Sequence, residues 1–374
     1  MVQSYISLSI SSTLHYSFKI HPYVGELSIF LCLKFGQTMD FRLTTDVSDF
    51  SLSLAVGDNV GAIGSCFAQH IGLRMHESGW PVLINPFGVL YNPSSIACAL
   101  QLLVDVSSGL DAGKALAPYL FEGRDGLWHS WLHASEFSAP TRSQCLHNVV
   151  DRVLQAAHSL TSWRVLLVTF GTSRVYRLLP DRFVVGNCHR EPAARFVEED
   201  LSVDDILSQW QPLLHNLFQR NPSLQVVFTV SPYRYVKYGL HGSQLSKARL
   251  LLAVDALCHR FAACRYFPAY EIVVDELRDY RFFDRDMAHP SSQAVDYVWE
   301  CFCRSAMQPE ALAYMQQYAA LRRDFSHRPL HPESESYIAF RERALQKWEM
   351  LRARYRLSGD VPLPYGENEN INRK

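Results

Sequence analysis

Short apolar runs alternate with helix-like stretches along most of the chain, and this alternation is the feature that most constrains the fold. The apolar runs are residues 59–63, 80–84, 164–170, 224–230 and 266–274. The helix-like stretches between them are residues 67–77, a segment starting at Asn92-Pro93, and residues 142–160, 202–220 and 244–264. Short apolar strands separated by helices of about 10 to 20 residues are typical of βαβ units. The pattern therefore predicts an α/β fold with a mostly parallel sheet.

Composition and charge exclude several classes of protein. Of the 374 residues, 48% are hydrophobic and 20% are charged, as in globular proteins, which excludes disordered, collagen-like and coiled-coil chains. Lys and Arg number 36 against 37 Asp and Glu, and no basic stripe occurs. We therefore expect neither a nucleic-acid partner nor binding to an anionic membrane surface. No apolar run reaches the ~18 residues of a membrane span.

The nine cysteines are odd in number, irregularly spaced, and free of any Cys-x-x-Cys pair. A disulfide framework or a structural zinc site would need even counts or paired ligands. We expect a reducing compartment, hence a cytoplasmic protein, and we predict no metal site and no cofactor.

The two ends of the chain differ from its centre. Residues 1–38 are rich in Ser, Tyr and Ile, and Met39 opens a segment that resembles a native start. We expect residues 1–38 to be a start-site extension outside the fold; the alternative is a weak membrane-directing segment. Residues 39–307 form the predicted main domain. Residues 308–374 are predicted to add two helices, 309–323 and 333–356, that pack on it through Trp348 and Leu351, and then a disordered tail.

Active groups of parallel sheets lie on loops at the carboxyl ends of strands. The most informative of these loops follows the last predicted strand, where Asp286 and His289 stand three residues apart just before a helix that we expect Pro290 to open. That spacing lets the carboxylate orient the imidazole as it takes a proton from a nucleophile. The alternative is a helix-capping loop around a buried histidine.

Several motifs in order resemble the GSCFA family of the SGNH, or GDSL-like, hydrolase superfamily. The first is Gly64-Ser65-Cys66-Phe67-Ala68, and the others are Asn85-Pro86-Phe87-Gly88, Thr169-Phe170-Gly171-Thr172-Ser173, Asn187-Cys188-His189, Thr229-Val230-Ser231-Pro232 and Ser246-Lys247-Ala248. The resemblance runs from about Met39 to Cys303. It implies a flavodoxin-like three-layer α/β/α sandwich and ester-bond chemistry.

The superfamily's first block, Gly-Asp-Ser, places its nucleophile at Cys66 when laid on without a gap. A shift of one residue makes Ser65 the nucleophile instead. We favour Cys66, because a helix N-terminus stabilises a thiolate; the alternative is a buried structural thiol, which leaves the role to Ser65.

The resemblance also implies donors for an oxyanion. Gly88 fits the second-block glycine, although a turn glycine would look the same. Ser173 stands where the third block has Asn, and this departure puts full hydrolytic power in doubt. Asn187 or the Asn85 amide are the candidate replacements.

Weaker candidates for substrate binding are Asn85, His133, Arg234 and Lys247. His133 lies in a loop that lines the pocket or else the surface, and the two cations hold an anionic group or are ordinary surface charges. We expect an esterase acting on a small-molecule or carbohydrate ester. An acyltransferase to a sugar hydroxyl and a non-catalytic binding module are the alternatives, and the oligomeric state stays open.

Overall fold

The computed structural model describes residues 42–47, 50, 52–357 and 361–364. All helices and strands among these described residues belong to one compact unit, Thr44–Lys374. The expectations for residues 1–38 and for the tail after residue 365 lie outside the described residues.

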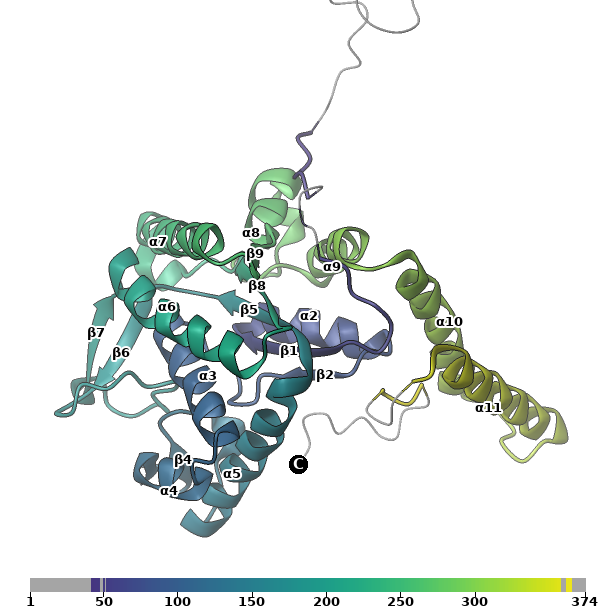
Figure 1. Cartoon of the computed structure of the whole chain (residues 1–374), viewed down its shortest axis with the longest axis horizontal. Helices are drawn as coiled ribbons and strands as arrows, with labels where there is room; N and C mark the ends of the chain where they lie inside the picture. Colours follow the sequence, from purple (N-terminus) through teal and green to yellow (C-terminus); the bar gives the residue numbers. More distant parts are fainter. Residues whose placement is uncertain (1–41, 48–49, 51, 358–360, 365–374) are drawn as a thin grey trace, which may run out of the picture. The chain divides into compact units, whose positions relative to one another are not determined.

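The centre of this unit is a parallel sheet of five strands (Figure 1). The strands are β1 (Asn59–Gly64), β2 (Val82–Ile84), β5 (Trp163–Phe170), β8 (Gln225–Val230) and β9 (Cys264–Tyr266). They lie side by side in the order β2-β1-β5-β8-β9. Counted along the chain this is the order 2-1-3-4-5 of flavodoxin-like folds, so the winding reverses between β1 and β5. The predicted parallel sheet is confirmed, and the reversal marks the edge where a site is expected.

Helices cover both faces of the sheet, as the three-layer expectation requires. Leu166, Val168 and Phe170 of β5 belong to one apolar core, and Val165 and Leu167 to the other. The first core is completed by α3 (Pro93–Ser107), α5 (Arg142–Ser159), α6 (Val203–Arg220) and α7 (Gly239–Arg260), and the second by α2 (Cys66–Glu77) and α9 (Ser292–Ala306). Alternate side chains of a strand point to opposite faces, so both faces of this strand are buried.

Side-chain caps set two of the helix starts that the sequence predicts. Asn92 accepts the N–H of Ser95 at 2.8 Å and caps α3, with Pro93 in its first turn. Ser202 and Asp205 form a reciprocal capping box at the start of α6. Both predictions are confirmed.

The predicted strand 266–274 is wrong over most of its length. Strand β9 ends at Tyr266, and the chain continues as α8 (Ala269–Glu271) and a π-helix, η6 (Ile272–Leu277). The carbonyl of Pro268 accepts the N–H of Ile272 at 3.0 Å. Ile272 and Val273 are buried in the core beside α2 and α9, so burial decides the conformation against the β propensity of this run.

The remaining short elements lie outside the central sheet. Two antiparallel pairs join β3 (Leu120–Glu122) to β4 (Trp128–Ser130) and β6 (Arg174–Leu178) to β7 (Phe196–Asp200). The short helical elements are α4 (Ala112–Leu116), η1 (Ala117–Tyr119), η2 (Ser135–Phe137), η3 (Leu160–Ser162), η4 (Ala193–Arg195), η5 (Val236–Tyr238) and η7 (Tyr280–Phe282).

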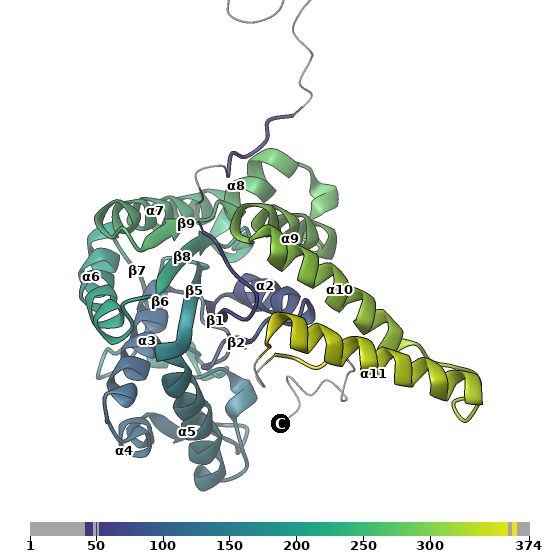
Figure 2. The same cartoon turned by 45° about the vertical axis from the view of Figure 1, so that its right-hand side comes forward.

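Two long helices, α10 (Pro309–Ser326) and α11 (Glu335–Tyr355), are the last described helices and lie side by side (Figure 2). Trp348 and Leu351 are buried in an apolar cluster formed mainly by these two helices; that they anchor the pair on the main domain stays a prediction. Tyr314 of α10 donates its hydroxyl to the carbonyl of Gly79 at 2.9 Å, just beyond the C-terminal end of α2. None of the described helices is both long and apolar enough to cross a membrane.

Candidate active site

The turn between β1 and α2 depends on a glycine. Gly64 has a φ of 140°, and a Cβ atom there would lie 2.2 Å from the carbonyl oxygen of Thr169 on β5. The N–H of Gly64 donates to Asn85 Oδ1 at 2.9 Å, and the N–H of Ser65 donates to that same Thr169 carbonyl at 3.2 Å. The next two residues, Ser65 and Cys66, are thereby fixed at the start of α2.

The two nucleophile candidates occupy different positions at this helix start. Ser65 is the N-cap, is 3% exposed, and accepts the N–H of Phe67 at 3.3 Å. Cys66 is the first helical residue and is half-buried, with its Sγ 3.6 Å from the hydroxyl of Tyr91. Both lie where the helix dipole favours negative charge.

Asp286 and His289 contact each other as the spacing predicts. One carboxylate oxygen, Oδ1, accepts the N–H groups of Ala288 and His289, both at 2.9 Å, and the other accepts from Nδ1 of His289. The backbone and side chain of His289, and then the Ala288 N–H, lower the pKa of Asp286 to about 2. A carboxylate charged at neutral pH keeps the proton on Nδ1 and leaves Nε2 for proton exchange. Pro290 lies before the helix rather than in it, because Ser291 is the N-cap of α9.

The nucleophile candidates and the histidine line the same cleft, which has a volume of about 470 Å³. Ser65, Cys66 and His289 all line it. The other lining residues are Phe67, His70, Arg74, Tyr91, Ser231, Tyr233, Tyr235, Asp284, Pro290, Ser292 and Val295. The cleft therefore lies beyond the carboxyl ends of β1 and β8, on the side where the sheet order reverses.

Three tyrosines in this cleft were not predicted from the sequence. The ring of Tyr233 lies 4.2 Å from that of His289, between ring centres, and 4.6 Å from the ring of Tyr235. Tyr91 touches Cys66, as described above. Tyr91 stands three residues after the motif Asn85–Gly88, and Tyr233 stands directly after Ser231-Pro232. Their position next to these motifs is the signal from which they could have been predicted.

Gly88 and Asn85 build the loop after β2. Gly88 has a φ of 74°, donates its N–H to the carbonyl of Asn85 at 2.8 Å, and leaves no room for a Cβ atom, which would lie 2.3 Å from that of Ala134. The N–H of Gly88, which the resemblance implies as an oxyanion donor, is thus already used inside the turn. Asn85 is buried; its Oδ1 holds the N–H of Gly64, and its amide nitrogen has no hydrogen-bond partner among the described residues.

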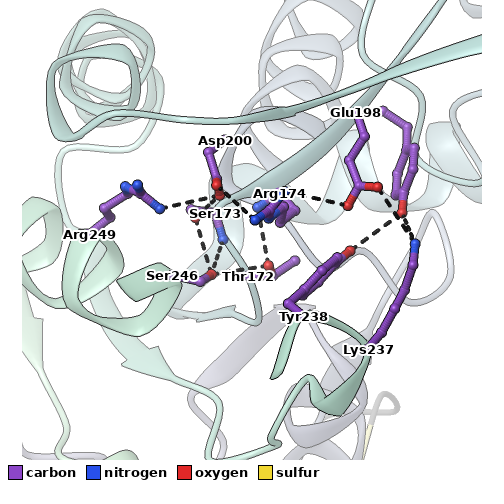
Figure 3. Close-up of polar contacts among 10 residues, drawn as sticks. Thr172, Ser173, Arg174, Glu198, Asp200, Lys237, Tyr238, Ser246 and Arg249 are labelled. Atoms are coloured by element: carbon purple, nitrogen blue, oxygen red, sulfur yellow. Dashed lines mark hydrogen bonds and ion pairs between the residues drawn. The ribbon is translucent and has the colours of Figure 1, made fainter. Parts of the chain in front are cut away.

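Ser173 is directed into a buried polar network and not into the cleft (Figure 3). Its N–H donates to Ser246 Oγ at 2.8 Å, and its hydroxyl donates to Asp200 Oδ1 at 2.9 Å. Arg174 and Arg249 pair with that same carboxylate at 3.1 and 3.3 Å. Ser173 therefore links the end of β5 to β7 and α7, and its donors are already used.

Asn187 lies between β6 and β7, where its Oδ1 accepts the N–H of His189 at 2.8 Å. It is absent from the cleft lining. Of the three side chains considered for the third-block role, Ser173, Asn187 and Asn85, none lines the cleft.

His133 is fully buried, so the expectation that it lines a substrate pocket is not met. Its ring stacks on Phe87 with centres 4.6 Å apart, and its Nδ1 bonds to Ser130 Oγ at 2.9 Å. Burial, with a smaller contribution from His189, lowers the pKa of His133 to about 3. It is a neutral core residue beneath the loop after β2.

Lys247 is 2% exposed, which excludes the surface-charge interpretation. Its Nζ donates to the carbonyls of Gly171 and Ser231 at 2.5 and 2.6 Å, so it ties together the loops that follow β5 and β8. Burial, and then the charge of Arg234, lower the pKa of Lys247 to about 7. Arg234 itself donates its backbone N–H to the carbonyl of Ala288 at 3.1 Å and so supports the Asp286–His289 loop.

Among the described residues, no three His, Cys, Asp or Glu side chains are grouped so that they could hold a metal ion.

Comparisons with known proteins agree with the motifs. A comparison with curated proteins finds no match. The family model of the GSCFA family matches residues 59–302, and the model of the GSCFA domain protein C-terminal domain matches residues 318–359, on α10 and α11. Because the first match covers more than half of the chain and includes every element of the cleft, the chain belongs to the GSCFA family.

Proposed function

We propose that this protein is an SGNH-type hydrolase that cleaves ester bonds of a carbohydrate or another small metabolite. One observation carries the proposal: a cleft at the switch point of the sheet holds two nucleophilic side chains at a helix start and a histidine whose Nδ1 is bound by a carboxylate. Nucleophile, base and orienting carboxylate are the three roles that acyl transfer needs.

Cys66 is the proposed nucleophile. Its side chain is more accessible than that of Ser65, whose hydroxyl is occupied with capping α2. Ser65 remains the second candidate because it also lines the cleft.

The proposed reaction has two steps. The Cys66 thiol gives its proton to Nε2 of His289, and the sulfur attacks the ester carbonyl carbon. The carbon–oxygen bond to the alcohol breaks, and the alcohol leaves with the proton from His289. Water then gives a proton to His289 and attacks the thioester carbon. The carbon–sulfur bond breaks, His289 returns the proton to the sulfur of Cys66, and the acid is released. Asp286 stabilises the imidazolium in both steps, and the N–H of Cys66, in the first turn of α2, is a donor for the oxyanion.

The cleft lining supports a small polar substrate. Three tyrosines give flat surfaces, while His70, Arg74 and Asp284 place polar groups around them. A pocket with aromatic walls and a few fixed polar groups suits a compact, hydroxyl-rich ester.

The test is hydrolysis of p-nitrophenyl acetate by the full chain, with and without a sugar acceptor. We expect turnover that His289→Ala abolishes while the fold is retained. Release of nitrophenol without free acetate, together with an acetylated sugar, would identify an acyltransferase instead. No turnover above that of His289→Ala would refute the proposal.

The nucleophile is identified by trapping the acyl-enzyme and mapping it by mass spectrometry. We expect the acyl group on Cys66 and large losses of activity in Cys66→Ala and Cys66→Ser. Cys98→Ser is the matched control, because Cys98 is exposed on α3 and is not part of the cleft. Acyl mass on Ser65 would contradict the assignment to Cys66.

A further inference from the structure

We propose that Tyr91 is a further catalytic residue of this site: its hydroxyl donates a hydrogen bond to the sulfur of Cys66 and stabilises the thiolate. The inference rests on the proposed function in taking Cys66 as the nucleophile. It assigns the activation of the thiol to a tyrosine in addition to His289 and the helix start.

The first support is the position of the hydroxyl. It lies 3.6 Å from Sγ of Cys66, within the range of hydrogen bonds to sulfur, and both side chains line the cleft. Tyr91 is 38% exposed, so its ring is part of the cleft wall rather than of the core.

The second support is a rigid backbone at Tyr91. Its carbonyl accepts the N–H groups of Gly171 and Thr172, at 2.8 and 2.9 Å. The preceding residue, Leu90, donates its N–H to the carbonyl of Gly64 at 2.9 Å, and the following residue, Asn92, caps α3. Contacts with the loops that follow β1, β2 and β5 therefore fix the backbone of Tyr91. Its hydroxyl reaches the sulfur without any movement of this backbone.

The third support is the direction of the bond. Burial, followed by interaction with Cys66, raises the pKa of Tyr91 well above its usual value of about 10. A phenol that stays protonated at neutral pH can donate, and a thiolate can only accept. The bond is then charge-assisted, and such bonds are stronger than bonds between neutral groups.

Other groups around the sulfur are less suited to this role. The cleft also holds His70 and Arg74 from α2, Asp284 and His289 from the loop before α9, and Tyr233 and Tyr235 from the loop after β8. Arg74 is paired with Asp296 at 2.7 Å and with Glu77 at 3.3 Å. Of the residues described in the cleft, only Tyr91 makes a hydrogen bond to Cys66 Sγ.

The experiment is the rate of alkylation of Cys66 by iodoacetamide between pH 5 and 10, with the modified cysteine identified by mass spectrometry. We expect Tyr91→Phe to raise the pH midpoint of alkylation by about one unit, which makes the reaction at pH 7 roughly tenfold slower. Tyr233→Phe is the matched control: it removes a hydroxyl from the same cleft, whereas the hydrogen bond to Cys66 Sγ described among these residues comes from Tyr91.

Alkylation needs no ester substrate, so the inference and the proposed function can fail separately. An unchanged midpoint in Tyr91→Phe, or an equal shift in Tyr233→Phe, would overturn the role of Tyr91 even in an active esterase. A midpoint that shifts only in Tyr91→Phe would support it even if no ester were cleaved. In an active enzyme, we expect Tyr91→Phe to lower kcat/KM at pH 7 about as much as it slows alkylation, and less at high pH.

Discussion

Substitution of Gly64 by Ala tests whether the close approach of β1 and β5 positions Cys66, the proposed nucleophile. Gly57 gives a matched control, because it also has a positive φ, of 87°, but has open space where a Cβ atom would be placed. At Gly64 the same atom would meet the Thr169 carbonyl at 2.2 Å and the Thr169 nitrogen at 2.9 Å. Both variants therefore place a side chain at positive φ, of 87° at Gly57 and 140° at Gly64, and only Gly64→Ala adds the collision.

The expected loss of stability follows from these two contributions. Backbone strain for a residue with a side chain at positive φ costs about 1–2 kcal/mol, which is the whole effect expected in Gly57→Ala. The collision in Gly64→Ala involves backbone atoms of a central strand, so relief requires separating the strands. Overpacking of this kind adds about 1–3 kcal/mol, and the sum for Gly64→Ala is about 2–5 kcal/mol.

The assay is urea unfolding followed by tryptophan fluorescence, combined with the alkylation rate of Cys66. We expect Gly64→Ala to lose more stability than Gly57→Ala, and only Gly64→Ala to change the reactivity of Cys66, because the bond from the Ser65 N–H to Thr169 must lengthen. Equal losses of stability in the two variants, with normal reactivity of Cys66 in both, would refute the reasoning.

Three further predictions concern other parts of the molecule. Asp286→Asn should lower kcat/KM by about 10³-fold or more. The loss should extend throughout pH 5–9, because the carboxylate that is replaced has a pKa of about 2 and is charged over that whole range. A pH–rate profile checks this, and a variant of full activity contradicts it. His133 is held neutral in the folded state with a pKa of about 3, so the unfolded chain binds the extra proton and stability falls as the pH drops from about 6.5 towards 3. Between pH 7 and pH 5 the loss of stability amounts to about 2 kcal/mol. His133→Phe should therefore reduce the difference between the urea midpoints measured at these two pH values. An unchanged difference would show that His133 does not cause the loss. Trp348→Ala should cost about 3–5 kcal/mol and expose α10 and α11 to limited proteolysis, whereas normal resistance would mean that the buried indole does not hold the helical pair.

The sequence predicts the framework of the site better than its interior. The starts of α3 and α6 follow from local signals, since Asn92 and Ser202 act on backbone groups only three residues away. The contact between Asp286 and His289 is also local, because the two residues lie three positions apart in one tight loop. These features need no knowledge of the tertiary structure.

The errors arise where tertiary packing decides. The run 272–274 reads as a strand from its β-branched residues, yet it is helical because Ile272 and Val273 fill the core beside α2. His133 and Ser173 look like site residues from their motifs, yet both point into buried polar contacts. Lys247 reads from its type as a cation that holds an anionic group or as a surface charge, and only the structure reveals the two loop carbonyls that its ammonium group joins.

The strand order has a consequence for the timing of synthesis. Cys66 and Tyr91 are synthesised early, whereas His289 follows Cys66 by 223 positions in the sequence. Strand β5, which pairs with β1 and supports the nucleophile turn, begins only at Trp163. At about 5–20 residues per second, a ribosome needs roughly 10–45 s between the thiol and the histidine. During that interval the nascent chain carries the proposed nucleophile without the proposed base. We therefore expect any product that stops before residue 289 to lack the proton relay and to cleave no ester.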